Sequence, residues 1–128
     1  MKPYHGVRWL ENRRSFPFVE HTLASLPGVL RALAADLDSD GDLDVLAASM
    51  VFGAAGNAAA KLASIVWLER LEDGAFRRHT LEMSGATQAA IAAGDFDLDG
   101  DTDFVVGNFS NAGSAPVSWL EIWENRTK

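Results

Sequence analysis

The stretches DLDSDGDLD, residues Asp36 to Asp44, and DFDLDGDTD, residues Asp95 to Asp103, decide how the rest of the chain is interpreted. Both fit the pattern D-x-D-x-D-G-x-x-D. Five carboxylates within nine residues repel one another strongly unless a cation neutralises them. Calcium suits such a loop, because it accepts roughly six to eight oxygen ligands in a flexible geometry. An acidic, solvated turn without metal is the alternative, and the presence of two such loops favours the metal.

Alternate positions of each loop are the predicted ligands. Positions 1, 3 and 5 would supply side-chain oxygens, position 7 its backbone carbonyl, and position 9 both carboxylate oxygens. The glycine at position 6 permits the positive φ of a sharp turn. We therefore expect two Ca²⁺ ions per chain, bound by Asp36, Asp38, Asp40, Asp42 and Asp44 in the first loop and by Asp95, Asp97, Asp99, Asp101 and Asp103 in the second.

The loops differ from EF-hands. An EF-hand requires a glutamate at position 12, where this chain has Ala47 and Val106, both inside apolar strand candidates. Magnesium is less expected than calcium, because it prefers fewer protein ligands and near-octahedral geometry.

The composition excludes several classes of function. Ten of the eighteen acidic residues lie in the two loops, and the remainder of the chain carries more basic than acidic residues, so the net charge of −7 reflects the loops. No basic patch with interleaved aromatics indicates a nucleic-acid partner. No apolar run is long enough for membrane insertion, and we expect no signal peptide, because Met1 to Gly6 lacks an apolar core. The absence of cysteine excludes disulfides and thiolate chemistry.

The chain repeats itself. His21-Thr22-Leu23 recurs 58 positions later as His79-Thr80-Leu81, and Trp9-Leu10-Glu11 recurs with the same offset as Trp67-Leu68-Glu69. A third Trp-Leu-Glu begins at Trp119, which places Trp9, Trp67 and Trp119 at equivalent positions. Repeats of this length indicate stacked supersecondary units.

Each repeat predicts four short strands, A to D, with the acidic loop between A and B. The expected strands are residues 29–35, 43–49, 65–71, 75–81, 89–93, 104–108 and 117–123, with a loop at 53–64 and a hairpin turn at Asp73-Gly74. The alanine-rich runs are too short for stable helices, so we expect strands there too. The fold class is therefore all-β, with four-stranded antiparallel propeller blades.

The loops, their flanking strands and the repeat length resemble the FG-GAP/VCBS repeat family, which includes the calcium-binding blades of integrin α-subunit propellers. This resemblance implies structural calcium bound by the ten aspartates, and an extracellular or cell-surface location. Family propellers usually have seven blades, whereas this chain encodes about two.

The domain prediction follows from the strand count. Residues 1–28 would hold strands C and D of a partial blade, residues 29–86 a full blade, and residues 87–128 strands A, B and C of a further blade. Because propellers have roughly four to eight blades, we expect a homo-oligomer, a trimer with six blades or a tetramer with eight. A neighbour's C and D strands could complete the last blade, which would leave one C strand surplus.

The leading functional hypothesis is a non-enzymatic calcium-binding module with a structural or binding role. No nucleophile or acid–base constellation supports an enzyme, and the repeated His21 and His79 indicate a shared structural hydrogen bond. The alternative is a lectin with glycan sites between blades, and a protein ligand also remains open. For the tryptophans we favour packing over sugar stacking, with Trp123 the best candidate for an exposed platform.

Overall fold

The computed structural model describes residues 5–51, 61–83, 87–110 and 118–126, and these segments form nine strands and no helix. The strands are β1 (Val7–Glu11), β2 (Val19–Ala24), β3 (Val29–Ala35), β4 (Asp44–Ser49), β5 (Ile65–Arg70), β6 (Phe76–Glu82), β7 (Gln88–Gly94), β8 (Asp103–Asn108) and β9 (Leu120–Trp123). None of the described segments forms a helix with the length and apolar character needed to cross a membrane.

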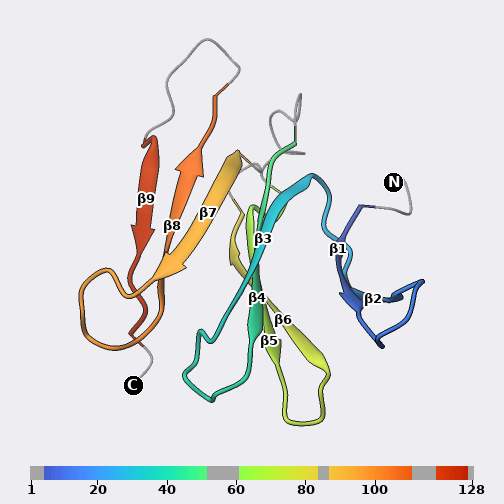
Figure 1. Ribbon diagram of the computed structural model, residues 1–128. Helices are drawn as coiled ribbons and strands as arrows, with labels where there is room; N and C mark the ends of the chain where they lie inside the picture. Colours follow the sequence, from blue (N-terminus) through green and yellow to red (C-terminus); the bar gives the residue numbers. More distant parts are fainter. Residues whose placement is uncertain (1–4, 52–60, 84–86, 111–117, 127–128) are drawn as a thin grey trace.

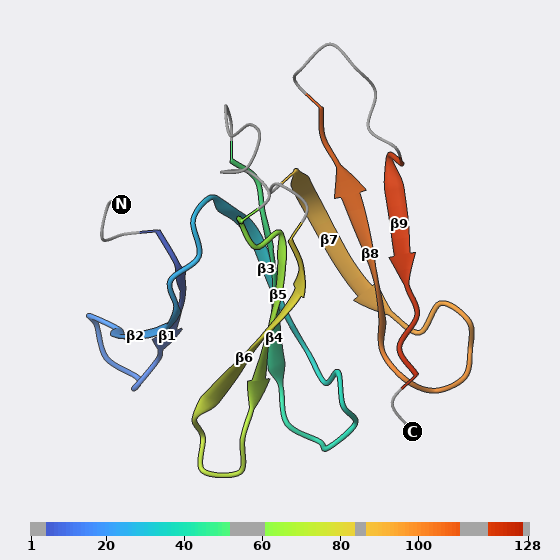
Figure 2. The same cartoon turned by 180° about the vertical axis from the view of Figure 1, so that it is seen from behind.

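Three antiparallel sheets lie side by side (Figures 1 and 2). The first sheet is β1-β2, the second is β3-β4-β5-β6 and the third is β7-β8-β9, and within each sheet neighbouring strands follow one another in sequence. The all-β, antiparallel prediction is confirmed, and β3 to β9 agree with the seven expected ranges to within three residues at each end. Most of the predicted loop at 53–64, and residue 117 of the last strand, lie outside the described residues.

The hairpin between β5 and β6 turns where Asp73-Gly74 predicts it. Gly74 has a φ of 79°, and its N–H donates to the carbonyl of Leu71 at 2.7 Å. The Ala75 N–H donates to Asp73 Oδ1 at 2.9 Å, so the aspartate side chain closes the turn that the glycine begins.

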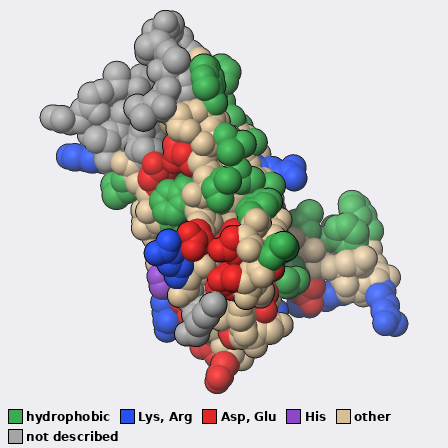
Figure 3. Space-filling view, turned by 90° about the vertical axis from the view of Figure 1, so that its left-hand side faces the viewer, with side chains coloured by type: hydrophobic (Ala, Val, Ile, Leu, Met, Phe, Trp, Pro, Cys, Tyr) green, Lys and Arg blue, Asp and Glu red, His purple; other side chains and the backbone are tan. Residues whose placement is uncertain are grey.

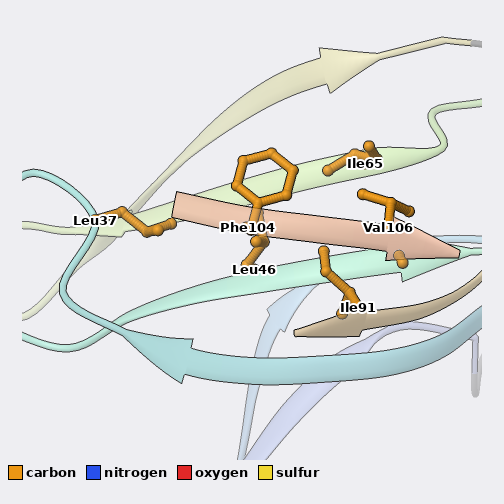
Figure 4. Packing of buried hydrophobic residues seen from close by; sticks show 7 residues of the cluster. Leu37, Leu46, Ile65, Ile91, Phe104 and Val106 are labelled. Carbon is orange, nitrogen blue, oxygen red and sulfur yellow. The ribbon is translucent and has the colours of Figure 1, made fainter. Parts of the chain in front are cut away.

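The second sheet is buried on both faces. Leu46 and Ala48 of β4 face the third sheet, and Ala47 between them faces the first sheet, because successive strand residues point to opposite sides. Figure 4 shows the cluster between the second and third sheets, whose buried members are Leu37, Leu46, Ala48, Ile65, Ile91, Phe104 and Val106. The cluster on the other face joins Val7, Leu26, Ala47, Val66 and Leu68.

The third Trp-Leu-Glu segment does not take the place that the sequence repeat predicts. Trp9 pairs with His21 and Trp67 pairs with His79, so these two tryptophans are equivalent. Trp119 precedes β9 and is exposed. Backbone pairing sets the register of a strand. Trp67 pairs with Leu46 of β4, and at the equivalent position of β8, Val105, the paired residue is Ile122 and not Trp119.

Truncation of a core leucine tests this arrangement. Leu46 is fully buried between the second and third sheets, so Leu46→Ala should lower the free energy of unfolding by about 2–5 kcal/mol in urea titrations. Leu30→Ala, at an exposed leucine of β3, is the control and should change it by less than about 0.5 kcal/mol. Equal losses in both variants would contradict the packing described above.

Candidate metal centres

The two acidic loops connect equivalent strands and share one backbone conformation. The first joins β3 to β4 and the second joins β7 to β8. At position 4 Ser39 has a φ of 62° and Leu98 a φ of 65°, and at position 6 Gly41 has 93° and Gly100 has 98°. A φ near 95° is outside the left-handed range that other residues tolerate, so this turn requires glycine. The same turn is therefore built twice from different intervening residues.

The hydrogen bonds inside the loops also repeat. In the first loop the Gly41 N–H donates to Asp36 Oδ2 at 3.1 Å and the Asp40 N–H to Asp38 Oδ1 at 3.3 Å. In the second loop the Gly100 N–H donates to Asp95 Oδ2 at 3.1 Å and the Asp99 N–H to Asp97 Oδ1 at 3.2 Å. These bonds turn the side chains of positions 1 and 3 toward the inside of the turn.

Positions 1, 3 and 5 come together in each loop. Carboxylate oxygens of Asp36, Asp38 and Asp40 lie within 4.8 Å of one another, and so do those of Asp95, Asp97 and Asp99. Two oxygens on opposite sides of a Ca²⁺ ion are about 4.6–5.2 Å apart, twice the calcium–oxygen distance. The spacing of both groups therefore fits a shared calcium ion.

The position 9 aspartates are buried and form two hydrogen bonds each. Asp44 Oδ2 accepts the Leu37 N–H at 3.2 Å and Oδ1 accepts the Arg70 N–H at 2.7 Å. Asp103 Oδ2 accepts the Phe96 N–H at 2.9 Å and Oδ1 accepts the Asn125 N–H at 2.8 Å. Each carboxylate thus links the start of its loop to the end of the third strand of its sheet. The predicted bidentate coordination by these residues stays a prediction, since each oxygen has lone pairs left.

The position 7 aspartates differ between the loops. The Asp42 carboxylate lies 3.5 Å from Arg70 Nη1 and is partly exposed. The Asp101 carboxylate is buried, and neither of its oxygens has a hydrogen-bond donor among the described residues. Coordination through the position 7 carbonyl remains a prediction for both loops.

Loss of hydration, together with neighbouring acidic groups, raises several carboxyl pKa values. Burial raises the pKa of Asp38, and the charges of Asp44, Asp40 and Asp36 add to this, against the N–H of Asp40. Although Asp97 is exposed, partial loss of hydration, followed by the charges of Asp99, Asp103 and Glu124, raises its pKa against the N–H of Asp99. The contact with the Asp99 carboxyl group, followed by burial, raises the pKa of Asp101 to about 6. Both loops therefore carry more negative charge than their own hydrogen bonds neutralise.

Unpartnered oxygens point to a missing ligand in both loops. Asp36 Oδ1 in the first loop and both Asp101 oxygens in the second are shielded from solvent and lack a hydrogen-bond partner among the described residues. A buried polar atom without a partner costs free energy. A divalent cation would satisfy these oxygens and would also reduce the repulsion that raises the pKa values. The residues present therefore fit a calcium ion.

Two residues that support the loops have no signal in the sequence. Arg70 donates its N–H to Asp44 and pairs with Asp42. The Asn125 side-chain amide donates to the carbonyl of Leu37 at 2.6 Å, across the interface between the third and second sheets. Their roles depend on which strand end lies beside which loop, which the spacing of aspartates does not reveal.

The histidine prediction is confirmed as a repeated structural unit. The His21 Nε2 atom lies 3.0 Å from Glu11 Oε2, and the His79 Nε2 atom lies 2.6 Å from Glu69 Oε2. The His21 ring stacks on Trp9 with centroids 4.5 Å apart, and the His79 ring stacks on Trp67 at 4.6 Å. Because both units link neighbouring strands in the same register, they strengthen the pairing of those strands.

Comparison of the chain with protein-family models, curated protein sequences and solved structures gives no significant match.

The buried aspartates can be tested without metal. In EDTA, Asp44→Asn should destabilise the fold by about 1–3 kcal/mol, because an amide cannot accept both the Leu37 and the Arg70 N–H groups. Asp40→Asn keeps an oxygen for the Asp42 N–H and removes one repelling charge, so it should be neutral or stabilising. Urea titrations of the two variants measure this difference in sign. Equal destabilisation would contradict the role of the Asp44 carboxylate as a clamp that holds the loop to β5 through the Leu37 and Arg70 N–H groups.

Proposed function

We propose that the chain is a non-catalytic, calcium-binding repeat module of the FG-GAP/VCBS kind, in which two Ca²⁺ ions stabilise blade-like sheets. The observation that carries this proposal is the pair of loops with one shared conformation, each gathering three carboxylates within 4.8 Å. The unpartnered oxygens of Asp36 and Asp101 support it, because a cation would satisfy them.

The ions would act through the fold. The first loop links β3 to β4, and its Asp44 also links to the end of β5. A Ca²⁺ ion held by Asp36, Asp38 and Asp40 would fix the loop and so the relative position of all three strands. The same relation holds for the second loop and β7, β8 and β9. The proposed role of the ions is therefore structural. Any ligand would bind to the surface of the sheets that the ions stabilise.

The wider predictions remain part of this proposal. Propeller architecture, self-assembly into a six- or eight-bladed ring and an extracellular or cell-surface location follow from the resemblance and from the number of sheets. β9 already pairs with β8 in this chain, so β1 of a neighbour could occupy that edge only by displacing β9. If copies exchanged strands, this pairing would favour the N-terminal C strand as the surplus one, whereas copies that keep their sheets intact leave β1 paired with β2.

Calcium removal tests the module directly. Titration calorimetry should give two Ca²⁺ ions per chain, one ion for Asp38→Ala or Asp97→Ala, and none for the double variant, because alanine supplies no ligand oxygen. At a free Ca²⁺ concentration about 100 times Kd, each site should add about 2.7 kcal/mol to the free energy of unfolding, and EDTA should lower the Tm correspondingly.

Leu98→Ser is the matched control, because the first loop carries Ser39 at the same position. This variant should keep both ions and the full Tm difference. A Tm that is the same in Ca²⁺ and in EDTA would contradict the proposal. A larger increase in Tm with Mg²⁺ than with Ca²⁺ would identify magnesium as the metal.

A second candidate function, glycan binding, is favoured by one cleft. A cavity of about 620 Å³ opens between the first and second sheets, lined by residues that include Trp9, His21, Leu43, Arg70 and Phe76. The exposed face of Trp9 suits sugar stacking, and His21 and Arg70 offer polar contacts. Trp123, the platform expected from the sequence, is instead half-buried and stacks on Phe104 with centroids 5.3 Å apart.

A glycan array on the calcium-loaded protein tests this alternative. If the cleft is a sugar site, Trp9→Ala should weaken binding at least tenfold. Trp119→Ala, which removes an exposed tryptophan outside the cleft, should leave binding unchanged. No glycan signal from the wild-type chain would leave the calcium module as the only function supported.

A further inference from the structure

Some side chains on the outer faces of the first and third sheets are exposed, although the side chains at the equivalent positions of the second sheet are buried. Backbone pairing defines the equivalent positions in the second and third sheets. Asp44 and Asp103 begin β4 and β8, and Val45 pairs with Leu68 as Phe104 pairs with Trp123. Phe104 and Trp123 face the second sheet, while Val45 and Leu68 face the first sheet. Each sheet thus presents the same side to the sheet before it.

The outer face of the third sheet is apolar. Ile65 of β5 is fully buried against the third sheet, and its equivalent in β9, Leu120, is 58% exposed. Trp67, partly buried in the same cluster, has Ile122 as its equivalent, which is 63% exposed. Figure 3 looks onto the side of the molecule where the third sheet lies and shows hydrophobic side chains in a column across it. The third sheet therefore repeats the contact surface of the second, and no described segment packs against it.

The acidic loops continue this pattern. Leu37 at position 2 of the first loop is 7% exposed, because its side chain inserts between the second and third sheets. Phe96 at position 2 of the second loop is 49% exposed. Together, Phe96, Leu120 and Ile122 define the third-sheet outer face.

The outer face of the first sheet corresponds to the side of the second sheet that packs against the first sheet. Leu68 is 1% exposed and packs toward the first sheet, whereas its equivalent in β1, Leu10, is 58% exposed. Phe18, which is equivalent to the partly buried Phe76, is also exposed. Leu10 and Phe18 define the first-sheet outer face. The polar pair on this face, Arg8 and Glu20, is joined at 3.0 Å and adds no net charge.

We propose that copies associate with their sheets intact, instead of exchanging strands, so that the third-sheet outer face of one copy docks on the first-sheet outer face of a second copy. The expected partner is a second copy of the chain, because contacts of this kind already exist inside the molecule. The third-sheet outer face is equivalent to the side of the second sheet that packs on the third sheet, and the first-sheet outer face to the side that packs on the first sheet. Such a contact is heterologous, so each copy keeps one free face of each kind, and the chain of copies either closes into a ring or grows. Repeat stacks that stay monomeric need polar end faces, whereas the described outer faces of this chain expose Leu10, Phe18, Leu120 and Ile122.

The inference names the partner in the proposed module, and its test is separate from calcium binding. Light scattering coupled to size-exclusion chromatography, in Ca²⁺, should show the wild-type chain as an oligomer. Ile122→Lys and Leu10→Lys should each be monomeric, since either change places a charge in the contact. An equimolar mixture of the two variants should form a dimer and nothing larger, because only one intact pair of faces remains.

Matched variants make the outcome decisive. Leu98→Ser removes an exposed leucine outside both faces and should keep the wild-type mass. Leu120→Lys and Phe18→Lys repeat the test should either first variant fail to fold by circular dichroism. A monomeric wild-type chain at millimolar concentration, or a mixture that stays monomeric, would overturn the interface. An oligomer unaffected by Leu10→Lys would overturn the pairing of unlike faces. Calorimetry on the same samples reports whether both Ca²⁺ ions are bound, so failure of the interface is distinguishable from failure of the calcium module.

Discussion

A buried aspartate at the start of the second strand of a sheet holds the acidic loop and the third strand together. In the second sheet the carboxylate of Asp44 accepts one backbone N–H from the loop and one from the end of β5, and Asp103 does the same in the third sheet. A buried carboxylate without such partners would be strongly destabilising. With them, it fixes the point at which three strand ends meet, and the other aspartates of the loop gather around that point.

This clamp also connects the loop to the contact between sheets. Leu37 donates its N–H to Asp44 while its side chain packs in the core between the second and third sheets. Its carbonyl accepts the side-chain amide of Asn125, which extends from the end of β9. One loop residue therefore takes part in the hydrogen bonds around the acidic turn and in the packing of the next sheet. A cation that orders the loop would consequently order the sheet–sheet contact as well.

The sequence was sufficient for the features that depend on local pattern. The acidic loops, the strands that flank them and the turn at Gly74 are all encoded within a few residues, so their positions agree with the structure. The predicted equivalence of Trp119 with Trp67 is wrong, because a repeated Trp-Leu-Glu sequence does not fix the register of a strand. Backbone pairing between β8 and β9 fixes it, and the loop before β9 differs in length from the loop before β5. The roles of Arg70 and Asn125 were not predictable, because they depend on contacts between segments distant in sequence.

Directional stacking has a consequence that a single sheet would not have. Every sheet presents one side to the preceding sheet and the other to the following one, so a stack built from repeats ends in two unlike faces. In this chain, Phe104 and Val106 of the third sheet cover the side of β4 and β5 that faces them. On the corresponding side of the third sheet, Ile122 is exposed. Trp123 of β9 also packs in the interior contact, and β1, the equivalent of β9, carries the exposed Leu10 at the corresponding position. The repeat that stabilises the interior is thus also the reason why the two ends suit each other.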